Sequence, residues 1–211
     1  MKTITALEPQ KRAPGRVNLY LDGEFALGLD LETAHRLQVG QQLAPEAIAE
    51  LQNNETFVRA RQSAERLLAF RPRSEAEIWR SLKQKGYETP VIEQTIDRLR
   101  EVSLLDDAAF VQYWIDQRVT FKPRSLMALR QELLQKGVPR PVIEAGLATI
   151  DEEAIARQAA ANRANRWAHL PYEEYAQKMG RYLQQRGFSY ELTTQMVAES
   201  WRELDANDSA S

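Results

Sequence analysis

Between Arg118 and Arg140 the chain carries six basic side chains and a single acidic one, Glu132. Cations in this excess can pair with carboxylates of a protein partner or neutralise the phosphates of a nucleic acid. The plainer alternative is a solvated helix face, with residues such as Lys85 and Lys136 only complementing helix C-terminal dipoles. We predict that a partner-binding surface is formed by basic residues from the middle of the chain: Arg71, Arg73, Arg80, Lys83, Lys85, Arg118, Lys122, Arg124, Arg130, Lys136 and Arg140.

Catalytic and metal-binding residue patterns find no support. Cysteine is absent, and the two histidines, His35 and His169, lie far apart without flanking ligand motifs. Asp106 and Asp107 could form a paired-carboxylate site, but they precede an apolar run that begins at Phe110, where aspartate caps a helix. We therefore expect helix caps at these positions, no cofactor, no metal and no enzymatic activity.

The net charge of −2 is a sum of unlike parts. Residues 1–55 hold 5 basic and 8 acidic residues, residues 56–150 hold 16 and 12, and residues 151–211 hold 7 and 10. The positive middle suits an acidic protein surface or phosphates, but it is far weaker than the basicity of a dedicated nucleic-acid binder. No apolar run approaches the roughly 18 residues of a membrane span, and the N-terminus lacks a secretory signal. We expect a cytoplasmic protein.

The aromatic residues allow two interpretations. Stacking on nucleic-acid bases requires exposed rings, whereas Trp114 follows Phe110 by four residues, a spacing that directs both toward one core. We favour core packing for the whole set, which comprises Trp79, Phe110, Tyr113, Trp114, Trp167 and Trp201.

The N-terminal segment is expected to contain strands. Residues 16–21 and 24–29 alternate and are joined by Asp22-Gly23, a strong signal for a two-residue hairpin. Residues 4–7 supply a possible third strand, and Asp30 is a plausible N-cap for a short helix through Leu37. Alternation predicts that Val17, Leu19 and Leu21 share one face of their strand and that Phe25, Leu27 and Leu29 share one face of theirs. From Pro45 the pattern becomes helical, with Asn53 and Asn54 as possible interruptions.

An internal repeat occupies the rest of the chain. The four residues from Arg71 match those from Lys122 at an offset of 51, both having basic, proline, arginine and serine in order. A third, more divergent copy appears at an offset of 50, with residues 172–175 in place of that basic turn. Further matches are Leu82, Leu133 and Leu183, and the basic-glycine pairs ending at Gly86, Gly137 and Gly187.

The repeat contains its own helix boundaries. Ser74 and Ser125 can cap helices, and the three glycines can adopt the left-handed conformation that ends one. Each unit is thus predicted to contain three helices. Stacked units would bury a continuous core and form an elongated, curved array suited to long partners.

Three segments together resemble the RecX family of bacterial regulatory proteins: Arg71–Gly86 (RPRSEAEIWRSLKQKG), Leu104–Phe110 (LLDDAAF) and Leu129–Ile143 (LRQELLQKGVPRPVI). The resemblance spans about residues 57–201, and the hairpin resembles an extension seen in some members. It implies a modulator of the RecA recombinase, acting in recombination and DNA repair. Such a protein lodges in the groove of the RecA filament on single-stranded DNA and inhibits ATP hydrolysis and strand exchange. The departure at residues 172–175 puts a basic contact from the third repeat in doubt.

We therefore expect a mainly α fold with tandem three-helix repeats after a small β segment. The predicted divisions are residues 1–44, 45–104, 105–150 and 151–204, followed by a disordered tail at residues 205–211. The expected function is that of a monomeric, inhibitory RecA filament binder. The alternatives are a single- or double-stranded nucleic-acid binder, contacting DNA directly, and a helical scaffold for another partner.

Overall fold

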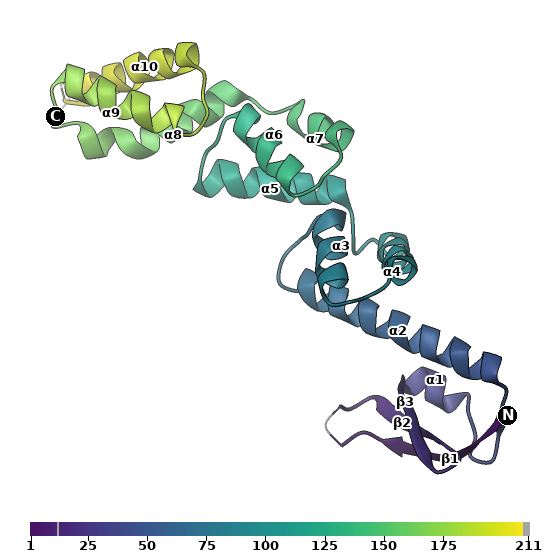
Figure 1. The fold of residues 1–211 in the computed structure, drawn as a ribbon. Helices are drawn as coiled ribbons and strands as arrows, with labels where there is room; N and C mark the ends of the chain where they lie inside the picture. Colours follow the sequence, from purple (N-terminus) through teal and green to yellow (C-terminus); the bar gives the residue numbers. More distant parts are fainter. Residues whose placement is uncertain (12, 209–211) are drawn as a thin grey trace. The chain divides into compact units, whose positions relative to one another are not determined.

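The computed structural model describes residues 1–11 and 13–208. Within them, an N-terminal segment of four strands and one short helix is followed by further helices, and the chain forms two compact units. The first comprises residues 1–71 and 78–104, and the second comprises residues 72–77 and those from Leu105 onward. Figure 1 labels the helices and the strands β1 to β3 as they are named below. The mainly helical fold with an N-terminal β segment is confirmed.

The N-terminal segment is a four-stranded antiparallel sheet in the order β3-β2-β1-β4. Its strands are β1 (Lys2–Pro9), β2 (Arg16–Leu21), β3 (Glu24–Asp30) and β4 (Gln42–Leu43). Asp22 and Gly23 have φ of 52° and 87°, as a type I′ hairpin turn requires. The predicted hairpin and third strand are therefore confirmed, and β4 is an addition.

The prediction that Phe25 shares a face with Leu27 and Leu29 is wrong. The β2–β3 pairing shifts between Leu19 and Tyr20, so that Leu19 pairs with Leu27 but Tyr20 pairs with Phe25. Ala26 is the extra residue of this bulge, which turns Phe25 to the opposite face from Leu27. Phe25 is accordingly 59% exposed and meets the Tyr20 ring edge-to-face at 6.0 Å.

Helix α1 (Leu31–His35) begins as expected, because Asp30 accepts from the Thr33 amide at 2.9 Å. Partial burial acts to raise the pKa of Asp30, but the hydrogen bonds from Thr33 outweigh it, so the pKa is lowered overall. The helix ends two residues before the expected Leu37.

Helix α2 (Pro45–Leu68) runs without a break through Asn53 and Asn54, contrary to the expected interruption. Asparagine costs a helix only about 0.7 kcal/mol relative to alanine, and packing outweighs that. Ile48 and Leu51 pack against the sheet core, and the buried Glu55 binds Arg16 of β2.

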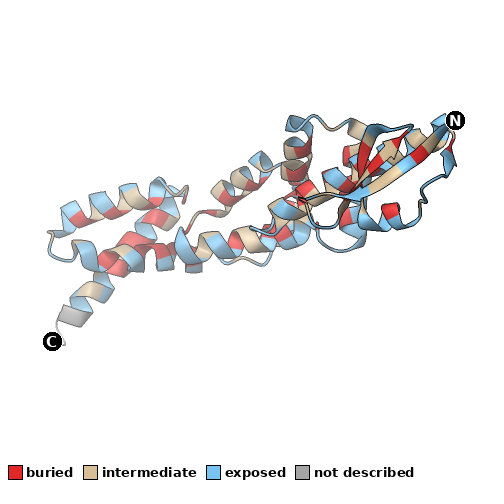
Figure 2. Ribbon diagram, turned by 90° about the horizontal axis from the view of Figure 1, so that it is seen from below, coloured by how far each residue is buried: buried red, intermediate tan, exposed pale blue. Residues whose placement is uncertain are grey.

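In the first repeat, α2 is followed by α3 (Glu75–Gln84) and α4 (Thr89–Glu101). The second contains α5 (Asp107–Phe121), α6 (Leu126–Gln135) and α7 (Arg140–Leu147). The third contains α8 (Glu152–Trp167), α9 (Tyr172–Gln184) and α10 (Tyr190–Asp208). Figure 2 shows the buried residues along the inner faces of these helices.

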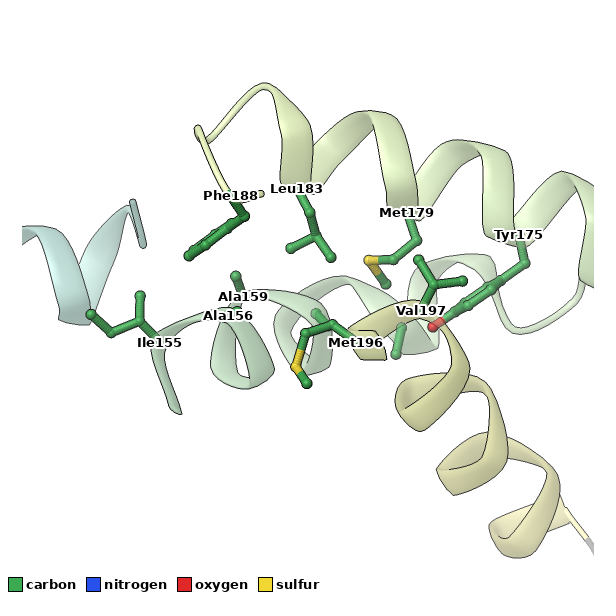
Figure 3. Close-up of a cluster of buried hydrophobic side chains, with 11 residues drawn as sticks. Ile155, Ala156, Ala159, Tyr175, Met179, Leu183, Phe188, Met196 and Val197 are labelled. Atoms are coloured by element: carbon green, nitrogen blue, oxygen red, sulfur yellow. The ribbon is translucent and has the colours of Figure 1, made fainter. Parts of the chain in front are cut away.

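Each of the last two repeats has its own apolar core. In the second, Phe110, Ile115, Leu129 and Leu133 are buried together. In the third, Tyr175, Met179 and Leu183 of α9 point toward α8 and α10 (Figure 3). The Tyr175 hydroxyl donates to Ser200 Oγ at 2.7 Å.

The predicted helix boundaries are confirmed. Ser74 Oγ accepts from the Glu77 amide and Ser125 Oγ from the Ala128 amide, at 3.2 and 3.1 Å. Gly86, Gly137 and Gly187 all have φ between 82° and 89°.

The expected disordered tail at residues 205–211 differs from the structure over residues 205–208, because α10 continues through Asp208. The tail lacks apolar anchors, but its residues extend a helix whose earlier turns are already packed, so no new nucleus is needed. The remaining residues of that prediction, 209–211, lie outside the described part of the chain.

Candidate partner-binding surface

The predicted basic surface is distributed over both units. Arg71, Arg80, Lys83 and Lys85 belong to the first unit, and the other seven residues belong to the second. Five are exposed, namely Arg80, Lys83, Lys85, Lys122 and Arg140. Six are half-buried, namely Arg71, Arg73, Arg118, Arg124, Arg130 and Lys136. More than half of the set is therefore partly enclosed by the chain itself.

Glu132 is the only acidic residue between Arg118 and Arg140, and its carboxylate interacts with several neighbouring side chains. Its Oε2 accepts from Arg118 Nε at 2.6 Å and from Trp114 Nε1 at 2.8 Å. Its Oε1 lies 3.7 Å from Arg124 Nε. The Arg118 guanidinium also lies over the Trp114 ring, 4.5 Å from its centroid. This half-buried network holds α5 against α6 and partly neutralises two of the predicted contact residues.

A second carboxylate pairs with two more cations. Arg130 donates twice to Glu144, with distances of 2.6 and 2.9 Å, joining α6 to α7. These bonds raise the pKa of Arg130 and lower that of Glu144. Arg140 Nε lies 3.8 Å from the same carboxylate, but its side chain is 76% exposed. Arg140 is therefore more accessible to solvent than Arg130, whose side chain is 33% exposed.

Lys136 is also used within the chain. Its Nζ lies 3.0 Å from the largely buried Glu77 carboxylate and 4.9 Å from the Trp114 centroid. Its backbone carbonyl accepts from Ser74 Oγ at 2.7 Å. Lys136 thus contacts Ser74 and Glu77 at the start of α3, and residues 72–77 belong to the same compact unit as Lys136.

The remaining cations differ in how far they are engaged. Lys85 donates to Ser63 Oγ, and Lys83 Nζ lies 3.5 Å from Thr89 Oγ1. Arg71, Arg73 and Arg80 have interaction partners as well. Lys122, at the end of α5, makes no side-chain hydrogen bond or ion pair within residues 1–11 and 13–208, and it is exposed. Lys122 is therefore the most available cation of the set.

The proline-containing turn before α6 has a role inside the chain that the sequence did not indicate. Pro123 and Ser125 are buried. The Ser125 amide donates to the Arg186 carbonyl at 3.1 Å, and Arg124 Nη1 donates to the Gln185 carbonyl at 3.3 Å. These hydrogen bonds attach the turn to the end of α9 in the next repeat. Ser74 makes the corresponding contact with the end of α6.

A carboxylate completes each of these contacts. The Glu75 amide donates to Asp107 Oδ1 at 2.9 Å, and the Leu126 amide donates to Glu152 Oε1 at 2.8 Å. Asp107 and Glu152 are the first residues of α5 and α8. The predicted capping role is confirmed for Asp106, which accepts from Ala108 and Ala109. Asp107, however, caps α3 instead of its own helix.

The third repeat has no such turn. Pro171 is the N-cap of α9, so the helix already includes residues 172–175, where the second repeat has its turn. Tyr175, which aligns with Ser125, is fully buried and bonds inward to Ser200. In the third repeat the aligned residues therefore belong to the helix and its core instead of a basic turn.

The predicted core set of aromatic residues is largely enclosed. Phe110 is buried, while Trp79, Tyr113, Trp114, Trp167 and Trp201 are half-buried. Sequence reasoning missed two exposed aromatics, Phe70 and Phe121, which are 86% and 71% exposed. Their signal was present, since each immediately precedes the basic residue of a repeated turn.

Metal binding and membrane insertion gain no support from the described residues. No group of three or more histidine, aspartate or glutamate side chains within residues 1–11 and 13–208 is placed to hold a metal ion. In the same ranges, no helix has the length and apolar character needed to cross a bilayer.

Comparison with known families resolves the identity of the repeats. The model described as the regulatory protein RecX N-terminal domain matches residues 2–44. The models of the first, second and third RecX three-helix domains match residues 60–99, 106–147 and 151–196. The chain belongs to the RecX family. The resemblance noted in the sequence is thereby confirmed.

Curated RecX relatives match almost the whole chain. The regulatory protein RecX of Clostridium beijerinckii is 28% identical, over 93% of this chain and 95% of its own. That of Clostridium perfringens strain 13 is 29% identical with the same coverage. That of Lactobacillus delbrueckii subsp. bulgaricus is 28% identical, over 97% of this chain and 77% of its own.

Solved RecX structures share the fold. A crystal structure of regulatory protein RecX has a TM-score of 0.70 and 25% identity, covering 94% of this chain and 100% of its own. The crystal structure of RecX from Lactobacillus salivarius has a TM-score of 0.60 at 19% identity, covering 72% and 99%.

Proposed function

We propose that this RecX family member binds the RecA filament in its groove and reduces ATP hydrolysis and strand exchange. The observation that carries the proposal is the match of four RecX domain models along the chain. The curated relatives are named regulatory proteins, which favours action through binding rather than catalysis. RecA and its filament enter through the family resemblance, and a cytoplasmic location follows from that partner.

A repeated fold suits a polymeric partner. Several weak contacts on one chain add through effective concentration, so that no single contact must be strong. A chain engaging several protomers would also impede the protomer movements that strand exchange requires. No cofactor is needed for such an effect, and a monomer is sufficient for it.

The predicted contact residues differ in whether they would have to break internal ion pairs in order to contact a partner. Lys122 and Arg140 are the most accessible cations of the second repeat. Arg118, Arg124, Arg130 and Lys136 would have to give up internal ion pairs to contact a partner. We therefore infer that the exposed cations make direct contacts and that the half-buried ones shape the repeats.

The proposal is tested by adding the protein to RecA filaments on single-stranded DNA and measuring ATP hydrolysis and strand exchange. Both rates should fall as the protein is titrated in. Unchanged rates at a large excess of protein would reject the proposal.

The second candidate is a nucleic-acid binder that competes for DNA, and the net positive charge of residues 56–150 favours it. The internal pairing of the central cations weakens it, because each paired cation is less available to phosphates. Fluorescence anisotropy with labelled DNA across a salt series, in the absence of RecA, separates the two. Tight binding that falls steeply with salt would support this candidate.

A further inference from the structure

Two phenylalanines stand out because they are large, apolar and exposed at equivalent places. Phe70 follows the end of α2 and is 86% exposed, and Phe121 ends α5 and is 71% exposed. They are 51 residues apart, the period of the repeat, in the segments FRPRS and FKPRS. A single exposed aromatic needs no explanation, but the same exposure at the same repeat position points to a use.

Both rings are largely exposed, so burial does not hold them in place. Phe121 is not among the residues of the apolar cluster of the second repeat, which contains Phe110 and Leu129. The third repeat has Pro171 at the corresponding position and begins α9 directly after it. An exposed phenylalanine at this repeat position thus accompanies the two repeats that keep the basic turn.

The neighbouring charges indicate what surrounds the ring in a complex. Each phenylalanine is followed directly by a cation, Arg71 or Lys122, and the Lys122 side chain is exposed. An exposed aromatic beside a cation fits an apolar pocket bordered by carboxylates, and buried aromatic anchors commonly dominate binding at interfaces.

A protein partner fits better than a nucleic acid. A strand that stacks on aromatic rings also needs cations along its phosphates. In the second repeat those cations are paired with Glu132, Glu144 and Glu77. One exposed lysine beside Phe121 can complement a pocket rim, but it provides little for a run of phosphates.

We propose that Phe70 and Phe121 are equivalent anchors for a protein polymer whose successive subunits each present an apolar pocket bordered by carboxylates. The inference rests on the proposed function, which supplies the filament as that polymer. Two anchors on one chain would bind neighbouring subunits cooperatively, because the first contact raises the effective concentration of the second.

The test compares the wild-type chain with Phe70→Ala, Phe121→Ala and the double variant for binding to RecA filaments on single-stranded DNA. Each single change should weaken the affinity about tenfold, and the double change about a hundredfold, as expected for interface aromatics. Tyr190→Ala is the matched control, because Tyr190 is 76% exposed but is followed by Glu191 instead of a cation. It should leave the affinity within about twofold. Thermal unfolding followed by circular dichroism should be unchanged in all variants, since the rings are exposed.

The outcomes separate this inference from the proposed function. Wild-type binding that all variants retain would overturn the anchors but keep the filament regulator. No wild-type binding would overturn both. If the phenylalanine variants instead lost affinity for free single-stranded DNA, with filament binding unaltered, the rings would be base-stacking groups and the inference would be wrong. An equal loss in Tyr190→Ala would also overturn it, because exposure alone would then explain the effect.

Discussion

The turn before α6 and the start of α9 occupy the same place in successive repeats but are built differently. In the second repeat, Lys122–Ser125 forms an extended turn, and Ser125 and Arg124 bond to the end of α9. In the third, the aligned residues are already helical, and Tyr175 bonds inward to Ser200. A repeated basic motif can therefore be a joint between repeats, and its loss in the last repeat need not mean a lost binding site.

The largest expected effect comes from placing a side chain in that joint. A Cβ at Gly187 would lie 2.6 Å from Ser125 Oγ and 3.2 Å from Ala128 Cβ, and Gly187 has φ of +89°. Ser125 cannot rotate away without losing its bond to the Ala128 amide. Gly187→Ala should lower the free energy of unfolding by about 3 kcal/mol, from left-handed strain and overpacking together.

Gly86→Ala is the control for this change. Gly86 has φ of +86°, but a Cβ added there would meet no atom of the described residues within 4 Å, so only the backbone strain of about 1 kcal/mol applies. Urea unfolding measured for both variants decides the comparison. Equal losses of unfolding free energy in the two variants would show that the added Cβ is accommodated beside Ser125, and would contradict tight packing between Gly187 and the turn.

The next effect concerns the carboxylate that completes the joint. Glu152→Ala removes the acceptor of the Leu126 amide and should cost about 1 kcal/mol, as the loss of a helix cap does. Glu173→Ala, in the first turn of α9, removes an exposed acid that has no such partner among the described residues, and it should cost about 0.3 kcal/mol. Chemical unfolding measures both. If both variants lost the same free energy of unfolding, the effect of Glu152 would be a general helix-dipole effect and not a contribution of its bond to the Leu126 amide.

Tyr175 aligns with Ser125 but points into the core of its own repeat, so its substitution tests the third repeat. Tyr175→Phe removes the buried hydrogen bond to Ser200 and should cost about 1 kcal/mol. Burial raises the pKa of Tyr175 above its ordinary value near 10. The neutral phenol is thus favoured in the folded state, and above pH 10 the unfolded state loses its proton first, so stability falls as pH rises. The variant should lack this part of the alkaline loss, which unfolding curves at pH 9 and above can detect. An identical alkaline loss in the variant would contradict the assignment to Tyr175.

The smallest effect is functional. Lys122→Glu reverses an exposed cation and should raise the concentration needed for half-inhibition of RecA ATP hydrolysis about threefold, the size of a rim charge effect. Lys178→Glu reverses an exposed cation of the third repeat and should change it little. If the two reversals act equally, the second repeat has no special part in partner contact.

Local chemistry predicted much of the fold. The Asp22-Gly23 turn, the serine caps and the left-handed glycines depend on neighbours within a few residues, and all were predicted correctly. Phe25 was misplaced because the bulge at Ala26 depends on pairing between strands. Asn53 remained helical because packing outweighs a small propensity cost.

The candidate site was harder to predict because its determinants are not local. The basic residues were chosen by charge, but whether Arg118 is available depends on Glu132 across two helices. The roles of Asp107 and Glu152 depend on how one repeat meets the amides of another. The exposure of Phe121 could not be read from its type, since phenylalanine is usually buried.

The most direct test of filament binding is an image reconstruction of RecA filaments on single-stranded DNA, formed with and without this protein. We expect additional density running along the filament groove, with ATP hydrolysis reduced in the same samples. Filaments with an empty groove and undiminished hydrolysis at saturating protein would contradict groove binding and inhibition together.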